Sequence, residues 1–310
     1  MGNSRIHAVP YLDFFGLQEP PFRLVPDTGC FFTGAQRGRT LDALVYAITQ
    51  GEGIVRITGE VGAGKTMLCR MLLEELPDTV DIAYLAVPSI DRQEVLRTLA
   101  KELDVKFDPS SDQHDLLELL QQELIERHAE GYRVALLVDE AHAMPVDALE
   151  QIRLLSNLET RTDKLLQIVL FGQPELDALL ETNELRALRD RVTHSFFLAP
   201  MEVSEVAAYL DLRLHTAGHT GGRLFPPASV RALTRAAGGL ARRVNILADR
   251  SLLAAYAHNS RTVLPRHVTL AVNDGRSPPV HKAPAAWIII LSGLVFGMLI
   301  TWLLLKVLHR

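Results

Sequence analysis

The sequence has very little cysteine and no internal repeat. Its 310 residues include two cysteines, Cys30 and Cys69, too few for a disulfide framework or a cysteine-based zinc site. The 11 histidines show no ligand spacing, so they predict no metal site. No period of roughly 20–50 residues recurs, which excludes solenoids and propellers. With 48% hydrophobic and 22% charged residues, the chain is not disordered and has room for one or two domains.

An excess of positive charge is also missing. The formal net charge is -5, and residues 1–284 carry 30 basic and 37 acidic side chains. Non-specific affinity for nucleic acid comes from neutralising phosphates, so this balance is not typical of a general DNA-binding protein. Nucleic acid is therefore not expected as a partner, although this balance does not exclude a local basic patch.

Charge is absent altogether from Ala285–Leu305, AAWIIILSGLVFGMLITWLLL. As a helix this run would be about 31 Å long, enough to cross the hydrocarbon core of a bilayer. Trp287 and Trp302 lie near its ends, where interfacial aromatic residues are found. A soluble helix that is apolar on every face would need protein all around it. The sequence therefore predicts one transmembrane helix at 285–305.

The orientation of this helix does not follow from charge, because two basic residues flank it on each side. Gly293 and Gly297 share one helix face. They either let two such helices pair closely or simply reflect the frequent use of glycine in membrane helices. The start, MGNSRIHAVP, has no apolar core, which predicts that there is no signal peptide. The use of ATP argued below would place the N-terminal part in the cytoplasm.

Apolar strand-like runs alternate with helical patterns as far as Pro200, and this alternation is typical of a parallel α/β sheet. After Pro200 the strands stop and four helical segments predict a small all-helical domain. Five strands are expected, at 54–58, 81–87, 132–138, 165–171 and 194–198. The predicted organisation is a lead segment with a first helix (1–50), an α/β domain (51–200), a helical lid domain (201–276), a linker (277–284), the transmembrane helix (285–305) and a short tail (306–310).

Residues 59–66, GEVGAGKT, fit the pattern GxxxxGK[ST] between a predicted strand and a predicted helix. Glycines let backbone N–H groups turn toward phosphate oxygens, and the helix N-terminus adds a favourable dipole. Lys65 is expected to reach the β- and γ-phosphates, and the Thr66 hydroxyl to bind Mg²⁺. We therefore predict ATP and Mg²⁺ as cofactors. The predicted nucleotide-binding residues are Gly59, Glu60, Val61, Gly62, Ala63, Gly64, Lys65, Thr66 and Met67.

A second apolar run ends in two acids, Asp139 and Glu140. Parallel sheets bind ligands at this edge, beyond the carboxyl ends of their strands. Asp139 is expected to hold Mg²⁺ through water, and Glu140 to orient and polarise the attacking water. A solvated acidic turn is the alternative. The letters DEAH at 139–142 also occur in helicases, but the sequence has no second RecA-like unit, so a helicase is not predicted.

Four further residues complete the predicted site. Gln173 follows the fourth strand and is either a sensor of the γ-phosphate or a turn residue. Arg191, with Arg189 as the second choice, is either an arginine finger for a neighbouring subunit or part of a solvated helix face. Arg242 opens a helix after a glycine pair and is either a phosphate ligand or a surface residue. The predicted catalytic set is Glu140, Lys65, Gln173, Arg191 and Arg189.

Six motifs occur in order over about residues 11–272: YLDFFGLQEPPFRLVPD, TGEVGAGKT, LLVDEAH, LLQIVLFGQPEL, LRALRDRV and GGLARRVNILADRSLLAAY. This set resembles the AAA+ ATPases of the general secretion pathway protein A type, a group close to pilus-biogenesis and exopolysaccharide- or exosortase-associated ATPases. The resemblance implies an α/β P-loop AAA+ fold with a five-stranded parallel sheet, a helical lid and a C-terminal transmembrane helix. It implies these roles: Walker A for 59–66, Walker B for Asp139 and Glu140, sensor 1 for Gln173, the finger region for Arg191, sensor 2 for Arg242, and adenine packing for 22–27.

The resemblance also implies a function. The chain is expected to be a single-pass inner-membrane ATPase that self-associates and drives or regulates assembly of an envelope secretion, pilus or exopolysaccharide export machine. Proteins of this type continue beyond the membrane helix into a peptidoglycan-binding region, whereas 306–310 alone follow here. Periplasmic action is therefore expected through an inner-membrane or periplasmic partner. Two alternatives stay open: a DNA-binding ATPase of the transposition target-selector type, and a nucleotide-gated membrane scaffold with little hydrolysis.

Overall fold

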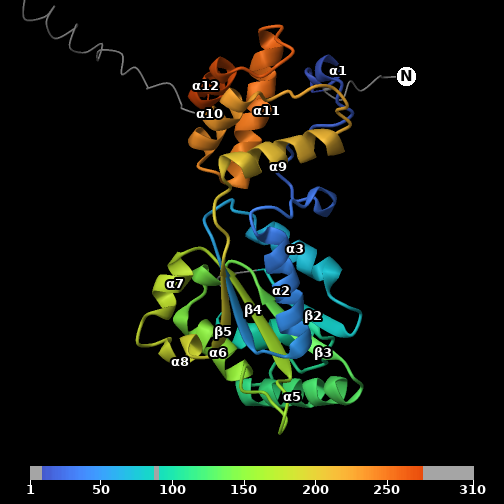
Figure 1. Cartoon of the computed structure of the whole chain (residues 1–310). Coiled ribbons are helices and arrows are strands. Elements are labelled where there is room, and N and C mark those ends of the chain that lie inside the picture. Colours follow the sequence, from blue (N-terminus) through green and yellow to red (C-terminus); the bar gives the residue numbers. More distant parts are fainter. Residues whose placement is uncertain (1–8, 87–90, 275–310) are drawn as a thin grey trace, which may run out of the picture. The chain divides into compact units, whose positions relative to one another are not determined.

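The computed structural model of the chain describes residues 9–86 and 91–274. In this part the chain forms a five-stranded sheet between helices, followed by four more helices (Figure 1). The predicted linker (277–284), the transmembrane helix (285–305) with Gly293 and Gly297, and the tail (306–310) lie outside the described residues. Within the described part, no helix is both long enough and apolar enough to cross a membrane.

All five strands are parallel, in the order β2-β3-β4-β1-β5. The predicted parallel sheet is thus confirmed, and the observed ends differ from the predicted ones by at most two residues. Such shifts are ordinary, because terminal pairings fray. The strands are β1 (Ile54–Thr58), β2 (Val80–Leu85), β3 (Arg133–Val138), β4 (Leu166–Gly172) and β5 (Val192–Phe197).

The central strands of the sheet are buried on both faces, as β3 illustrates. Val134, Leu136 and Val138 belong to one hydrophobic cluster, while Ala135 and Leu137 belong to the other. Successive side chains of a strand point to opposite faces, so an all-apolar strand needs helices on both sides. One face packs against α2 (Arg37–Gln50) and α3 (Lys65–Glu75). The other packs against α4 (Arg92–Glu102), α5 (Gln113–Ala129), α6 (Val146–Leu155), α7 (Glu175–Leu180) and α8 (Arg186–Arg189).

The helical lid follows β5 and comprises α9 (Val203–Thr216), α10 (Pro227–Ala237), α11 (Ala241–Ala257) and α12 (Pro265–Asp274). The turn between α10 and α11 consists of Gly238 and Gly239, both with positive φ (+65° and +70°). A Cβ atom at Gly239 would overlap the Met201 carbonyl, so only glycine lets this turn close. The turn sets the position of the first residues of α11.

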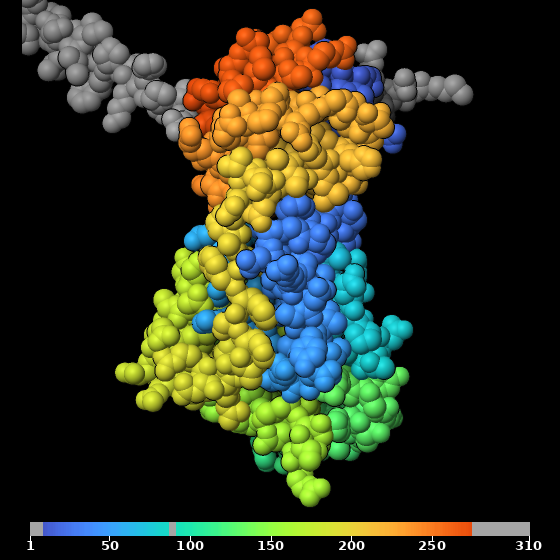
Figure 2. Space-filling model, in the orientation of Figure 1, coloured from blue at the N-terminus to red at the C-terminus, as the bar shows by residue number. Residues whose placement is uncertain are grey.

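Most of the buried residues of the lead segment pack with the helices of the lid. Its short helix α1 (Leu12–Phe15) and the residues around it pack into the core of the lid, where Tyr11, Phe15 and Phe22 are buried. The Tyr11 hydroxyl donates to Asp249 of α11. Figure 2 shows the blue N-terminal residues against the orange lid helices. The boundaries of the predicted domains remain predictions, but the lead contributes to the lid core.

Candidate nucleotide-binding site

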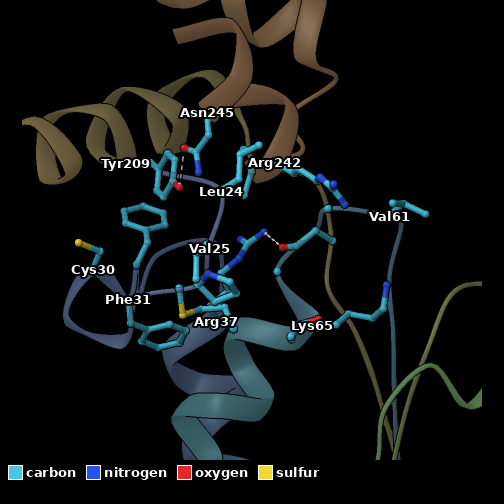
Figure 3. Close-up of a pocket in the computed structure, with 18 of the residues that line it drawn as sticks. Leu24, Val25, Cys30, Phe31, Arg37, Val61, Lys65, Tyr209, Arg242 and Asn245 are labelled. Atoms are coloured by element: carbon cyan, nitrogen blue, oxygen red, sulfur yellow. Dashed lines mark hydrogen bonds between the residues drawn. The ribbon is translucent and has the colours of Figure 1, made fainter. Parts of the chain in front are cut away.

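A pocket of about 350 Å³ opens where the P-loop, the lead and the lid meet (Figure 3). The structure brings most of the predicted nucleotide-binding and catalytic residues to its wall. These are Val61, Gly62, Ala63, Gly64, Lys65, Thr66, Met67, Glu140, Gln173 and Arg242. Gly59, Glu60 and Asp139 do not line the pocket, although they adjoin residues that do.

The P-loop turns through two glycines in the left-handed region, Gly62 (φ +82°) and Gly64 (φ +108°). Gly62 also meets the lid, because a Cβ atom there would lie 2.7 Å from Cβ of Arg242. The backbone N–H of Arg242 donates to the Gly62 carbonyl at 3.2 Å. The start of α11 therefore rests directly on the P-loop, and the Arg242 side chain lines the pocket.

Lys65 is the first residue of α3 and is buried. Its Nζ donates to the carbonyl oxygens of Gly59 (2.7 Å) and Glu60 (3.3 Å), both in the same loop. Burial lowers the pKa of Lys65, while the charges of Glu140 and Asp139 oppose that shift. The ammonium group thus has dipolar partners in the loop and no salt bridge within the described residues.

Asp139 follows β3 and is buried. Its carboxylate accepts hydrogen bonds from the Glu140 N–H (2.9 Å) and the Tyr84 hydroxyl (3.3 Å). Burial raises the pKa of Asp139, and the neighbouring Glu140 charge raises it further. No group of three or more His, Cys, Asp or Glu residues with metal-ligand geometry occurs in the described part of the chain. One carboxylate and the Thr66 hydroxyl nevertheless suit Mg²⁺, which takes oxygen ligands and keeps much of its water.

Glu140 and Gln173 meet beyond the ends of β3 and β4. Glu140 has a left-handed backbone (φ +53°), and its Oε2 accepts from Gln173 Nε2 at 3.2 Å. His142 joins them: its Nδ1 accepts from the Gln173 N–H at 3.3 Å, and its Nε2 lies 3.5 Å from Glu140 Oε2. Sequence reasoning treated His142 only as the last letter of DEAH. His142 thus contacts both the predicted catalytic carboxylate, Glu140, and the predicted sensor, Gln173.

The two predicted finger residues lie elsewhere. Arg191 donates to Ser156 Oγ at 3.2 Å, and Arg189 pairs with Glu181 at 2.7 Å. Neither side chain lines the pocket of its own chain. The structure therefore does not bring them to the other site residues.

The other end of the pocket is formed by the lead, and a buried arginine holds it there. Arg213 of α9 donates to the carbonyls of Pro21 (2.7 Å) and Arg23 (3.4 Å). Leu24 and Val25, which follow, line the pocket and are 54% and 70% exposed. Exposed apolar side chains at the pocket wall suit a flat, partly apolar group such as a purine base.

Within the lead segment 22–27, some residues line the pocket and others pack in the lid core. Phe22 is buried in the lid core and does not line the pocket, whose wall begins at Arg23. Two lining arginines, Arg37 and Arg213, were missed by sequence reasoning. Both are buried and donate to backbone carbonyls far away in sequence, and no local motif marks such contacts.

Comparison with known proteins agrees with the predicted resemblance. Residues 48–180 match the AAA domain. General secretion pathway protein A of Aeromonas hydrophila is 39% identical over 264 residues, which are 85% of this chain and 48% of that protein. The chain thus spans about half the length of this curated relative. The predicted similarity to ATPases of the general secretion pathway protein A type is confirmed.

Two solved structures show the same fold. Cdc6p of Pyrobaculum aerophilum is 19% identical, with a TM-score of 0.61 over 85% of this chain and 70% of that one. Drosophila ORC bound to DNA is also 19% identical, with a TM-score of 0.57 over 89% of this chain and 68% of that one. At this identity the likeness concerns the α/β AAA+ fold alone.

Proposed function

We propose that the chain, which matches the AAA domain over residues 48–180 and resembles general secretion pathway protein A, is an AAA+ protein of that type that binds ATP with Mg²⁺ and hydrolyses the nucleotide. One observation carries this proposal: the P-loop, Glu140, Gln173 and Arg242 come from four separate segments and line a single pocket. Convergence of a phosphate-binding loop, a carboxylate and a polar sensor is what hydrolysis of a nucleoside triphosphate requires.

Each residue has a role that its position supports. The Lys65 ammonium would exchange the carbonyls of Gly59 and Glu60 for phosphate oxygens, which are stronger partners for a buried cation. Thr66 and Asp139 would hold Mg²⁺, which neutralises phosphate charge when bound. Glu140 would orient the attacking water and accept its proton, while Gln173 would detect the γ-phosphate.

We further propose that Arg191 or Arg189 completes the site of a second copy. Both lie outside the pocket of their own chain, so a finger role requires self-association. Specific ATPase activity should then rise with protein concentration, and Arg191→Ala should remove that rise. Activity that is independent of concentration, and unchanged in the variant, would rule out a finger in trans.

The wider role rests on the resemblance and on the sequence. We propose that residues 285–305 anchor the chain in the inner membrane with the ATPase part in the cytoplasm. ATP turnover would drive or regulate assembly of a secretion, pilus or exopolysaccharide export machine through an envelope partner. The 30 basic and 37 acidic side chains of residues 1–284 do not favour the DNA-handling alternative.

Replacement of Glu140 tests the hydrolysis proposal. Glu140→Gln should retain ATP binding and lower hydrolysis at least about 100-fold, because the amide cannot accept a proton from water. The matched control is Glu130→Gln, an exposed acid at the end of α5, which should leave turnover unchanged. If wild type binds ATP but turns it over no faster than Glu140→Gln, the nucleotide-gated scaffold is the better description.

The same variant tests the partner. The full chain with Glu140→Gln would be crosslinked in its native membrane with ATP or ADP, and the captured proteins identified. Capture of an envelope-assembly protein with ATP only would support the proposed role and name the pathway. Salt-sensitive, ATP-dependent retention of DNA would instead favour the DNA-handling ATPase.

A further inference from the structure

Arg37 is a buried cation in the wall of the candidate nucleotide pocket. It is the first residue of α2, and the residue is only 6% exposed. The two residues before it, Ala35 (φ +52°) and Gln36 (φ +62°), both have left-handed backbones. Two successive non-glycine residues in this region are unusual, so surrounding contacts must hold the turn that directs Arg37 inward.

The guanidinium group of Arg37 connects three segments of the chain. Its Nη2 donates to the Ala63 carbonyl in the P-loop at 2.8 Å, the bond drawn in Figure 3, and approaches the Ala199 carbonyl at 3.4 Å. Its Nη1 approaches the Ala35 carbonyl at 3.5 Å. Ala199 lies between β5 and α9, where the chain passes from the sheet to the lid. Arg37 therefore joins the P-loop to the start of the lid.

The bond to Ala63 bears on phosphate binding. The carbonyl of Ala63 and the N–H of Gly64 belong to one planar trans peptide and point in opposite directions. A cation that binds the carbonyl polarises the peptide and makes the N–H a stronger donor. Arg37 Nε lies only 3.7 Å from where a Cβ atom of Gly64 would be. The positive charge thus sits directly behind the part of the loop that faces phosphate in a P-loop.

No carboxylate compensates this charge locally. Within the described residues, no Asp or Glu lies within 4 Å of the Arg37 guanidinium, and Glu205 acts on it only at longer range. The pocket wall as a whole is strongly basic, with Glu140 as its one acid. Its basic members are Arg23, Arg37, Lys65, Arg213 and Arg242.

We propose that Arg37 is a nucleotide-binding determinant whose buried charge is neutralised by the polyphosphate of the bound nucleotide rather than by an acidic side chain. A buried charge without a partner is costly, and a charge in a low-dielectric wall interacts strongly with an incoming anion. Arg37 therefore favours ATP over ADP, because ATP brings more negative charge to the P-loop. This inference rests on the proposed binding of ATP at this site.

The test separates the charge of Arg37 from its hydrogen bonds. Arg37→Gln keeps an amide donor for the Ala63 carbonyl but removes the charge, whereas Arg37→Lys keeps the charge. Dissociation constants of the full chain for MgATP and MgADP would be measured by calorimetry. Arg37→Gln should weaken ATP binding at least about tenfold and ADP binding less. Arg37→Lys should keep the wild-type preference between the two nucleotides.

Arg213→Met is the matched control, because Arg213 is equally buried in the same pocket but bonds the lead carbonyls at the other end. Arg213→Met should weaken the binding of MgATP and of MgADP by the same factor. The proposed role of the Arg37 charge is refuted if Arg37→Gln weakens ATP and ADP binding equally or leaves both affinities unchanged. It is also refuted if Arg37→Lys has the same effect as Arg37→Gln. Circular dichroism establishes that each variant is folded, and Arg37→Met replaces Arg37→Gln if the latter is not.

Failure of the inference is distinguishable from failure of the proposed function. Wild type must bind MgATP, and Lys65→Ala must weaken that binding at least about 100-fold, for the proposed function to stand. If wild type binds and Arg37→Gln does so equally well, only the role of Arg37 is lost. If wild type does not bind MgATP, the proposed function itself fails.

Discussion

The two ends of the nucleotide pocket are built in different ways. The P-loop at the phosphate end is one short segment, in which Lys65 bonds the carbonyl of Gly59 six residues away. The base end is assembled from distant segments: Arg213 bonds Pro21 across 192 residues, and Asn245 approaches the Arg23 carbonyl across 222. One end is therefore a property of a local loop, while the other exists only when the lead and the lid have packed together.

This difference separates binding from stability. The phosphate end carries charged and polar groups whose partners are largely backbone dipoles of the same loop. The base end depends on a core in which Tyr11 and Phe15 of the lead pack against helices of the lid. Removal of the Lys65 charge within the P-loop should affect nucleotide affinity alone, whereas changes at the base end should affect affinity and folding stability together.

The largest effect is expected at the phosphate end. Lys65→Ala should raise the dissociation constant for MgATP at least about 100-fold, because it removes the charge-assisted bonds to phosphate. The melting temperature without nucleotide should not fall, since the variant also removes a buried ammonium group whose pKa is lowered by burial. Calorimetry and differential scanning fluorimetry measure the two quantities.

Lys101→Ala, at an exposed position of α4, is the control and should change neither quantity. A drop of many degrees in the melting temperature of Lys65→Ala would contradict the comparison. It would mean that the P-loop depends on Lys65 for its fold as much as for ligand binding.

An intermediate effect is expected at the base end. Arg213→Met should leave the buried Pro21 carbonyl without its donor, and the Arg23 carbonyl with only the long bond from Asn245. The melting temperature should fall by about 4 °C, and the affinity for MgATP about tenfold, because an unpaired buried carbonyl is destabilising and the lead loses its anchor. Loss of affinity with unchanged melting temperature would show that both ends behave alike.

The smallest effect concerns the charge of Asp139. Burial raises the pKa of this carboxyl above its ordinary value, so the folded state binds more protons than the unfolded state between the two values. Stability therefore falls as pH rises through that window. At pH 7.5, without nucleotide or Mg²⁺, Asp139→Asn should melt about 2 °C above wild type.

This advantage of Asp139→Asn should disappear below the ordinary pKa of aspartate, where the wild-type carboxyl is protonated in both states. Melting curves of both proteins at several pH values are the measurement. A variant that is less stable than wild type at neutral pH would show that the bonds from Tyr84 and the Glu140 N–H outweigh the cost of burial.

Features with a local cause could be predicted from the sequence. The parallel sheet follows from apolar strands that alternate with helices, and the position of the P-loop follows from its glycines. The contact between Glu140 and Gln173 could also be predicted. Both follow strands of a parallel sheet, whose carboxyl ends lie at one edge.

Features that depend on tertiary packing could not be predicted. Arg37 and Arg213 donate to carbonyls 26 and 192 residues away, and an arginine in a helical pattern gives no sign of such a partner. The aromatic residues of the lead indicated burial but not which core they join. His142 lay in a recognised motif, yet its approach to Gln173 depends on the side-by-side pairing of β3 and β4.

The union of the lead with the lid also constrains how the protein forms during synthesis. Tyr11 leaves the ribosome early, but its partner Asp249 comes 238 residues later. At typical elongation rates this is a delay of roughly 10–50 s. Throughout that time the apolar side chains of the lead lack the helices that bury them in the finished protein. The lid core should therefore be the last part to close, and the nascent lead a natural substrate for chaperones.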